Sequence, residues 1–219
     1  MSSSNSISSI EVINFNCYAS NKQLYLRVRR YIELLIVSIL LLFLSPLLLV
    51  VSVLIKFSSK GSILYTQDRI GLDRKVFKIY KFRSMAAMEQ ITSVDTHYHD
   101  GLSFKLSGTC DPRITTIGKF IRKYSIDELP QLLNVIKGDM SLIGPRPTML
   151  ELYDDSTQIY LRTVVRPGMT GLWQVRNRAN PQVSNQLKYD SLYIENLTWK
   201  LDLYIIYKTI AIVFLGRGC

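Results

Sequence analysis

An apolar stretch from residue 34 to residue 55 constrains the fold of this chain more than any other feature. Its 22 positions carry no charged side chain. As a straight helix they would measure roughly 33 Å, which is enough to cross the hydrocarbon core of a bilayer. The stretch starts too deep in the chain for a secretory signal peptide and lacks a small-residue cleavage site. We therefore expect a membrane-embedded helix.

The surroundings of this stretch leave its course through the membrane open. Basic residues stand on both sides, among them Arg29 before it and Lys56 after it, and positive charge favours the cytoplasmic side at both ends. Ser45-Pro46 lies near the middle, where proline breaks or kinks a helix and the Ser45 hydroxyl can satisfy a freed carbonyl. The residues fit either a re-entrant helix-break-helix with both ends cytoplasmic or a kinked spanning helix.

The charge of the chain points to an anionic partner. Lys and Arg number 27 against 17 Asp and Glu, which gives a net charge of +10. The basic residues are scattered among apolar ones, without zinc-ligand pairs or an RNA-binding aromatic motif, so anionic lipid and phosphates fit better than nucleic acid. The three cysteines, Cys17, Cys110 and Cys219, lie far apart without CxxC spacing, so neither a disulfide framework nor a zinc site is indicated.

Hydropathy patterns predict a small mixed domain after the apolar stretch. In residues 62–82, aromatic and β-branched side chains flank a turn at 71–73, which predicts a hairpin. Residues 114–124 have apolar side chains at helical spacing, and residues 198–215 predict an amphipathic helix lying on the membrane. The Ser-rich tail, 1–21, and the polar segment 86–110 show no regular period.

Two adjacent acids, Asp127 and Glu128, stand in basic and apolar surroundings. Ser125 with Glu128 has capping-box spacing, and Pro130 predicts that the following helix starts no earlier than about there. A carboxylate among cations at the amide end of a helix stays ionised at neutral pH, which suits a nucleophile or a metal ligand. Considered without other information, the pair is better explained as ordinary first-turn acids that stabilise the helix dipole by about 0.3–1 kcal/mol each.

Several cations stand where a stiff backbone would hold them. Arg146 lies between two prolines and Arg166 precedes Pro-Gly, so each guanidinium is fixed at low entropic cost, as phosphate binding requires. Lys81 and Arg83 follow a strand-like run. Taken singly, each of these residues also fits a solvated surface charge. His97 and His99 lack a third ligand nearby, so a metal site there is not expected.

The order of these motifs resembles one known family. From about Arg29 to Leu215 the chain is similar to the bacterial sugar transferases, which are monotopic polyprenyl-phosphate phosphoglycosyl transferases. The motifs that carry the resemblance follow in sequence order. They are the apolar run with Ser45-Pro46, GSILYTQDRIGL (61–72), KIYKFRSM (78–85), DPRITTIGKFIRKYSIDELPQLLNVIKGDMSLIGPRP (111–147), VRPGMTGLWQV (165–175) and KYDSLYIENLTWKLDLYI (188–205).

The resemblance implies roles for particular residues. Asp127 and Glu128 match the family's catalytic dyad, with Asp127 as covalent nucleophile and as a ligand of Mg²⁺. Ser45-Pro46 matches the break of a re-entrant membrane helix. Expected contacts with substrate phosphate or nucleotide come from five cations: Lys81, Arg83, Arg113, Arg146 and Arg166.

The expected fold is α+β and mostly helical. It divides into a flexible basic tail (1–28), the re-entrant helix (29–57) and a cytosolic catalytic domain (58–219) with a short hairpin and interfacial helices. The resemblance implies an enzyme of the bacterial inner membrane that faces the cytoplasm. It would transfer a sugar 1-phosphate from a UDP-sugar to polyprenyl (undecaprenyl) phosphate with Mg²⁺, release UMP and start glycoconjugate synthesis.

The sequence also indicates which other partners to expect and which other class of protein is an alternative. Membrane lipids are expected partners and nucleic acid is not. The sequence leaves open a homo-oligomer and the identity of the sugar. A basic membrane adaptor without catalysis is the alternative class, but an adaptor would not need an Asp-Glu pair beside fixed arginines.

Overall fold

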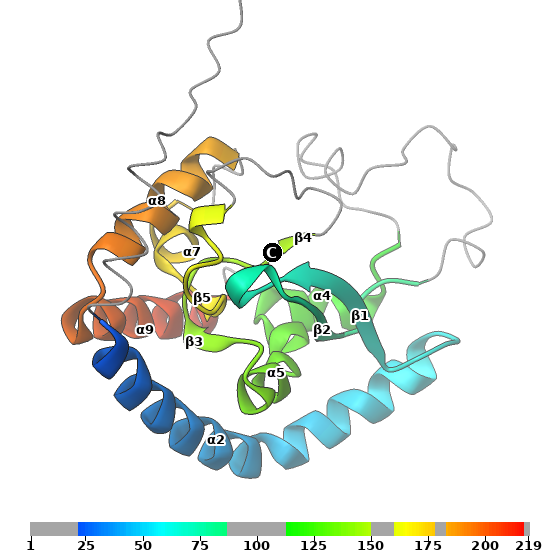
Figure 1. The fold of residues 1–219 in the computed structure, drawn as a ribbon. Helices are drawn as coiled ribbons and strands as arrows, with labels where there is room; N and C mark the ends of the chain where they lie inside the picture. The colour runs from blue at the N-terminus through cyan, green and yellow to red at the C-terminus, as the bar shows by residue number, and fades with distance from the viewer. Residues whose placement is uncertain (1–21, 87–112, 150–159, 178–182, 217–219) are drawn as a thin grey trace, which may run out of the picture.

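The computed structural model describes residues 22–86, 113–149, 160–177 and 183–216. Most of them are helical, with five short strands in two small sheets. Figure 1 shows a long N-terminal helix that curves along one edge of a compact group of strands and shorter helices. The predicted mostly helical α+β class is confirmed. Residues 1–21 of the predicted N-terminal tail and nearly all of the segment 86–110 lie outside the described residues, whereas residues 23–28 of that tail are helical.

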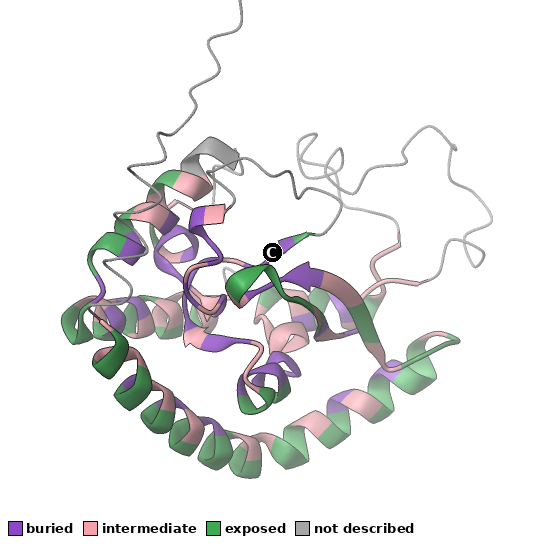
Figure 2. Ribbon diagram, viewed as in Figure 1, coloured by how far each residue is buried: buried purple, intermediate pink, exposed green. Residues whose placement is uncertain are grey.

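The apolar stretch lies within α2 (Gln23–Ser58), whose outward face is apolar and exposed. Among the described residues, α2 is the one helix long and apolar enough to cross a membrane. Figure 2 shows exposed residues along its convex side, whereas its few buried residues face the domain. Phe43 and Phe57 are 76% and 86% exposed. A continuous apolar surface of this kind marks a membrane or protein contact, so α2 fits a membrane-associated chain.

The predicted interruption at Ser45-Pro46 is not seen. α2 is assigned as one α-helix with Pro46 inside it, although its axis curves (Figure 1). Proline cannot donate to the carbonyl four residues earlier, which belongs to Leu42. The Ser45 hydroxyl donates to that carbonyl instead, at 2.8 Å. This bond confirms the expectation that Ser45 satisfies the freed carbonyl, and it lets the helix continue. The re-entrant course through a bilayer stays a prediction.

The predicted hairpin is confirmed. β1 (Leu64–Ile70) pairs antiparallel with β2 (Val76–Phe82), and the turn between them contains the short 3₁₀-helix η1 (Leu72–Arg74). Asp73 there has φ 52°, which Asp tolerates better than most residues. β4 (Thr148–Met149) pairs with the other edge of β1, so the sheet order is β2-β1-β4.

Two helices follow the hairpin. α4 (Thr116–Lys123) begins after Thr115, whose side chain accepts from the Gly118 amide. α5 (Gln131–Lys137) begins directly after Pro130, as predicted. The expected capping box is wrong: Ser125 has φ 55° and makes no side-chain cap. Ser125 has a left-handed backbone directly before the 3₁₀ turn η3 (Ile126–Glu128), and this turn contains Asp127 and Glu128.

The two stiff turns predicted from proline and glycine lie side by side. β3 (Ser141–Ile143) pairs in parallel with β5 (Gly168–Thr170), and the Gly168 amide donates to the Pro145 carbonyl at 2.9 Å. A Cβ at Gly168 would lie 2.0 Å from the Gly144 nitrogen, so only glycine allows the backbones this close. This contact fixes Arg146 relative to β5.

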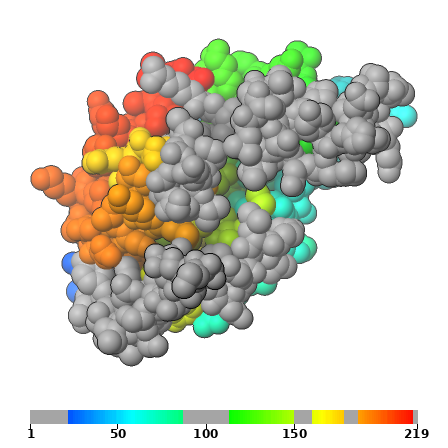
Figure 3. Space-filling model, turned by 90° about the horizontal axis from the view of Figure 1, so that it is seen from above, coloured from blue at the N-terminus to red at the C-terminus, as the bar shows by residue number. Residues whose placement is uncertain are grey.

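The remaining helices are α7 (Leu172–Arg176), α8 (Val183–Glu195) and α9 (Trp199–Phe214). Thr198 caps α9 by accepting from the Leu201 amide at 3.3 Å, which confirms the predicted C-terminal helix. Seen from above, α8 (orange in Figure 3) covers much of one side of the molecule. The described residues form three apolar clusters. α2 contributes the buried Val37, Val51 and Ile55 to two of them, and its partly buried Tyr25 and Leu26 pack against the third.

A buried polar network joins α2 to the domain near its N-terminal end. The Arg29 guanidinium donates to the Tyr193 hydroxyl at 2.6 Å and to the Ser141 hydroxyl at 2.8 Å. It also forms ion pairs with Glu33 and Asp202, each at 3.4 Å. All five residues are less than a tenth exposed. Because a buried charge is costly without partners, this network fixes α2 against β3, α8 and α9.

Candidate functional site

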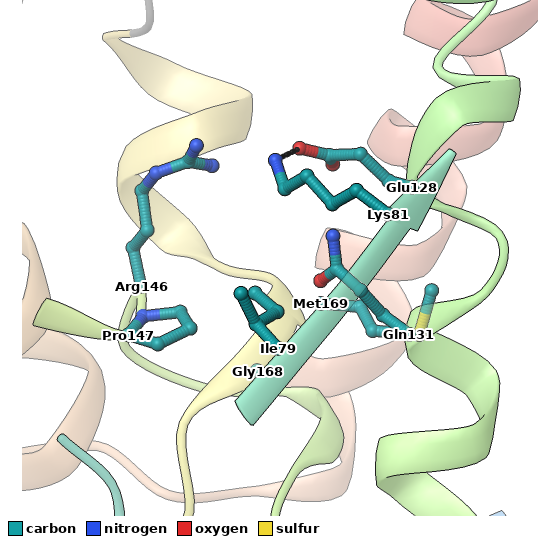
Figure 4. Close-up of a pocket in the computed structure, with 8 residues that line it drawn as sticks. All are labelled: Ile79, Lys81, Glu128, Gln131, Arg146, Pro147, Gly168 and Met169. Atoms are coloured by element: carbon teal, nitrogen blue, oxygen red, sulfur yellow. Dashed lines mark hydrogen bonds and ion pairs between the residues drawn. The ribbon is translucent and has the colours of Figure 1, made fainter. Parts of the chain in front are cut away.

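A recess lies between the hairpin, the turn after β3 and the start of α5. Figure 4 shows Arg146 and Pro147 on one side of it and Glu128 and Gln131 on the other, with Lys81 from β2 between them. The lining residues are Ile79, Lys81, Glu128, Gln131, Arg146, Pro147, Gly168 and Met169. Two cations and a carboxylate thus converge on a small surface whose remaining walls are largely apolar.

The ion pair at the centre of the recess joins β2 to η3. The Lys81 ammonium lies 2.7 Å from the Glu128 carboxylate, and each side chain is about one fifth exposed, at 19% and 22%. An ammonium next to the Asp-Glu pair can neutralise a phosphate that binds there. The structure therefore brings the predicted pair Asp127-Glu128 together with Lys81, a residue some 45 positions earlier in the chain.

Asn134 holds β2 in place beside this pair. Its side chain accepts from the Tyr80 amide at 3.0 Å and donates to the Lys78 carbonyl at 2.8 Å. The residue is fully buried. Its side-chain amide thus bonds to the backbone at the free edge of β2 as a neighbouring strand would, immediately before Lys81. Sequence reasoning missed this role because nothing in the local pattern links a helix residue to that strand edge.

The carboxyl of Asp127 is less acidic than an ordinary aspartate. Burial and the neighbouring Glu128 charge raise its pKa from 3.8 to about 6, although Lys81 and Arg122 oppose the shift. The sequence predicted a carboxylate stabilised by cations, and burial outweighs that effect. At neutral pH the group is still mainly ionised. It carries a charge that the protein stabilises incompletely, which favours a bound cation or a reaction at the oxygen.

The backbone at Arg146 is fixed by a buried ion pair between Arg162 and Asp190. Arg162 donates to the Arg146 carbonyl at 2.7 Å, and its Nε lies 2.8 Å from an Asp190 oxygen. Burial raises the pKa of Asp190 to about 6, although Arg162 opposes the shift. The backbone at Arg146 is therefore fixed by a prolyl turn and by this pair, while Figure 4 shows its guanidinium directed into the recess.

The other predicted cations lie outside the recess. Arg83 donates to the carbonyls of Ile55 at 3.3 Å and Ser59 at 2.6 Å, at the end of α2. Arg166 donates to the Gly138 carbonyl at 3.0 Å, after α5. Arg113 accepts through its carbonyl from the Ala86 amide at 2.8 Å. Their expected contacts with substrate stay predictions, and the structure does not bring them together with Lys81 and Arg146.

The residues that would hold Mg²⁺ are few. No group of three or more His, Cys, Asp or Glu side chains is gathered at a metal-binding distance within the described part of the chain. Among the described residues that line the recess, Glu128 is the one carboxylate, and Asp127 precedes it in η3. Mg²⁺ commonly binds through one or two carboxylates together with substrate phosphates and water, so this donor set fits a metal that arrives with a diphosphate.

Comparisons with known proteins show the family of this chain. The family model described as "Bacterial sugar transferase" matches residues 24–216. The chain is 40% identical over 198 residues to the exopolysaccharide production protein ExoY of Rhizobium meliloti, covering 87% of each chain.

Longer relatives carry names that state an activity. Over 168 residues the chain is 44% identical to the undecaprenyl-phosphate galactose phosphotransferase of Salmonella typhimurium, covering 72% of this chain and 34% of that one. Over 199 residues it is 37% identical to the UDP-glucose:undecaprenyl-phosphate glucose-1-phosphate transferase of Klebsiella pneumoniae, covering 87% and 41%. The chain thus spans less than half of these two relatives.

Proposed function

The chain belongs to the bacterial sugar transferase family, and on that premise we propose that it transfers a sugar 1-phosphate from a UDP-sugar to undecaprenyl phosphate. The observation that carries the proposal is the recess itself, where Glu128, the chain neighbour of Asp127, and Lys81 face Arg146. Relatives named for galactose and for glucose transfer to undecaprenyl phosphate support the reaction class. Because they differ in the sugar, the sugar of this chain stays open.

In the first step, an Asp127 oxygen attacks the phosphorus that carries the sugar. An oxygen–phosphorus bond forms to Asp127, and the bond to the UMP oxygen breaks, so UMP leaves with the electron pair. Lys81 and Arg146 would bind the phosphate oxygens, whose charge otherwise repels a carboxylate. Covalent catalysis divides a difficult transfer between two anions into two easier steps.

In the second step, an oxygen of undecaprenyl phosphate attacks the same phosphorus and Asp127 leaves as a carboxylate. The product is a sugar joined to the lipid through a diphosphate. Mg²⁺ held by Asp127 and Glu128 would neutralise the diphosphate charge. Glu128 keeps Lys81 in the recess through their ion pair, so both charges stay next to the reacting oxygen.

The exposed apolar faces of α2 and α9 would bring this site to the lipid. In α9, Leu203, Tyr207 and Phe214 are between 65% and 82% exposed and lie at helical spacing on one side. We place the enzyme on the cytoplasmic side of the bacterial inner membrane, where a soluble nucleotide sugar meets a lipid-anchored phosphate.

One assay tests the proposed reaction. The purified chain in lipid nanodiscs is incubated with undecaprenyl phosphate, Mg²⁺ and a panel of UDP-sugars, and UMP is measured. We expect UMP and a lipid-linked sugar with at least one donor, and loss of both after addition of a chelator. A non-catalytic adaptor would release no UMP with any donor, and that result would refute the proposal.

A further inference from the structure

Gln131 is the uncharged polar side chain among the described residues that line the recess. Gln131 is 3% exposed and lines the recess. Its carboxamide makes no hydrogen bond with any residue that the structure describes. Figure 4 shows this side chain directed toward the Lys81–Glu128 ion pair, with Arg146 on the opposite side. Neither amide atom of Gln131 is both fully buried and unpartnered, so the carboxamide can meet water or a ligand that enters the recess.

A second buried amide in the same helix shows what a structural role looks like. Asn134, three residues further along α5, bonds to both Tyr80 and Lys78 on the edge of β2. Both side chains are buried, but only that of Asn134 is satisfied within the described protein. Asn134 therefore has a structural role, whereas the Gln131 side chain is available to a ligand that enters the recess.

The backbone explains why Gln131 points there. Leu129 and Pro130 have helical φ and ψ, so the chain from η3 into α5 turns continuously. Residues three or four apart on such a turn share a face, which puts Gln131 on the face of Asp127 and Glu128. The recess thus has an ammonium, a guanidinium and a carboxamide converging on one small volume.

We propose that the Gln131 carboxamide donates a hydrogen bond to the diphosphate of the nucleotide sugar, a role that rests on the proposed function. A phosphate oxygen is the ligand atom that fits best, because Lys81 and Arg146 attract an anion to this recess. The amide is a neutral donor, so it can orient the phosphate that the two cations attract without adding a further charge beside the carboxylates. The sugar ring is the competing partner, since its hydroxyls could use the same amide.

Gln131→Met tests the proposal because methionine keeps the length and volume but cannot donate. Full-length wild type and variant are compared by kcat/KM for UMP release with UDP-glucose, UDP-galactose and UDP-N-acetylgalactosamine. Loss of a hydrogen bond to a charged group should reduce kcat/KM by roughly 10- to 100-fold. The reduction should be similar for every donor that the wild type uses, because all share the diphosphate.

Thermal unfolding separates this role from a structural one. Gln131→Met removes no hydrogen bond within the described protein, so its Tm should stay at or above that of wild type, whereas Asn134→Asp should lower Tm by breaking its bond to Lys78. UDP should raise the Tm of wild type more than that of Gln131→Met. A lower Tm for Gln131→Met, or an unchanged kcat/KM and an unchanged UDP effect, would overturn the proposal.

The remaining outcomes are also informative. A loss confined to one sugar would move the contact to the sugar ring and refute the phosphate assignment. Absence of UMP release by wild type with every donor would refute the proposed function instead. In that case the Tm shift caused by UDP still decides whether Gln131 contacts a diphosphate.

Discussion

The proton on Asp127 should govern activity at the scale of single residues. A carboxylate attacks phosphorus only when ionised, and burial with the Glu128 charge raises this pKa from 3.8 to about 6. We therefore expect kcat/KM to fall about tenfold per pH unit below roughly pH 6. A pH profile of UMP release checks this. If kcat/KM falls only near pH 4, at saturating Mg²⁺, the pKa of this carboxyl is not raised and the prediction is wrong.

The same shift makes a prediction about stability. A raised pKa in the folded state means that the contribution of this carboxyl to stability is present below pH 3.8 and is lost as pH rises through about 6. Asp127→Asn should therefore have a higher Tm than wild type at about pH 8, and the difference should shrink toward about pH 5. A variant less stable than wild type at pH 8 would contradict a destabilised charge.

Two arginines allow a matched comparison. Only Arg146 lines the recess, whereas Arg166 donates to the Gly138 carbonyl. Lysine keeps the charge but loses the guanidinium fork. Arg146→Lys should lower kcat/KM for the UDP-sugar by about tenfold or more, and Arg166→Lys should have the smaller effect on kcat/KM. The reverse order in steady-state kinetics would place the phosphate at Arg166.

At the scale of elements, the Arg29 network should carry much of the attachment of α2. Arg29→Leu leaves Glu33 and Asp202 buried without their cation, which should cost about 3–5 kcal/mol. The control is Arg27→Leu, since Arg27 is exposed on the same helix. Thermal unfolding in nanodiscs should show a clear loss for the first variant only. Equal Tm values would mean that the apolar contacts of α2 suffice.

Elements with a strong local pattern could be predicted from the sequence. Aromatic and β-branched residues on both sides of a turn predicted the hairpin of β1 and β2, and Pro130 predicted the start of α5, because each signal depends on neighbouring residues. The capping box failed because spacing does not reveal that Ser125 has a positive φ. β3 and β5 have three residues each, too few for a period. Asn134 and Arg29 act on partners that the fold alone brings near.

The candidate site divides in the same way. Asp127 and Glu128 are adjacent in the chain, so the pair was visible directly. The sequence could nominate Lys81 and Arg146 but could not separate them from Arg83, whose guanidinium binds the end of α2. Gln131 was missed, although its spacing of three from Glu128 was a usable signal. Which cations meet depends on contacts between distant segments.

At the scale of the whole molecule, the course of α2 through the bilayer decides where the site faces. We expect both ends on the cytoplasmic side. In a variant with its native cysteines replaced by serine, Arg27→Cys and Lys60→Cys probe the two sides of the apolar stretch. A membrane-impermeant thiol reagent should reach neither in intact cells and both after lysis. Labelling of Arg27→Cys alone in intact cells would show that α2 spans the membrane.

The proline at the centre of α2 should matter for this course. Replacing Ser45 and Pro46 with leucines restores a backbone donor and removes the ring. We expect the helix to straighten and the position of Arg27→Cys to become accessible from outside the cell. Leucine at Ser45 alone is the control, because Pro46 then stays in place. Unchanged labelling in the double variant would mean that the flanking charges alone set the topology.

Retention of label on Asp127 tests the account most directly. Wild type and Asp127→Asn are incubated with Mg²⁺ and a UDP-sugar labelled at the β-phosphate, without lipid acceptor, and protein-bound label and UMP are measured. Wild type should retain up to one label per chain, release matching UMP and lose the label when undecaprenyl phosphate is added. Asp127→Asn should fold, retain no label and release no UMP. Label retained by Asp127→Asn, or none by an active wild type, would contradict covalent catalysis at this carboxylate.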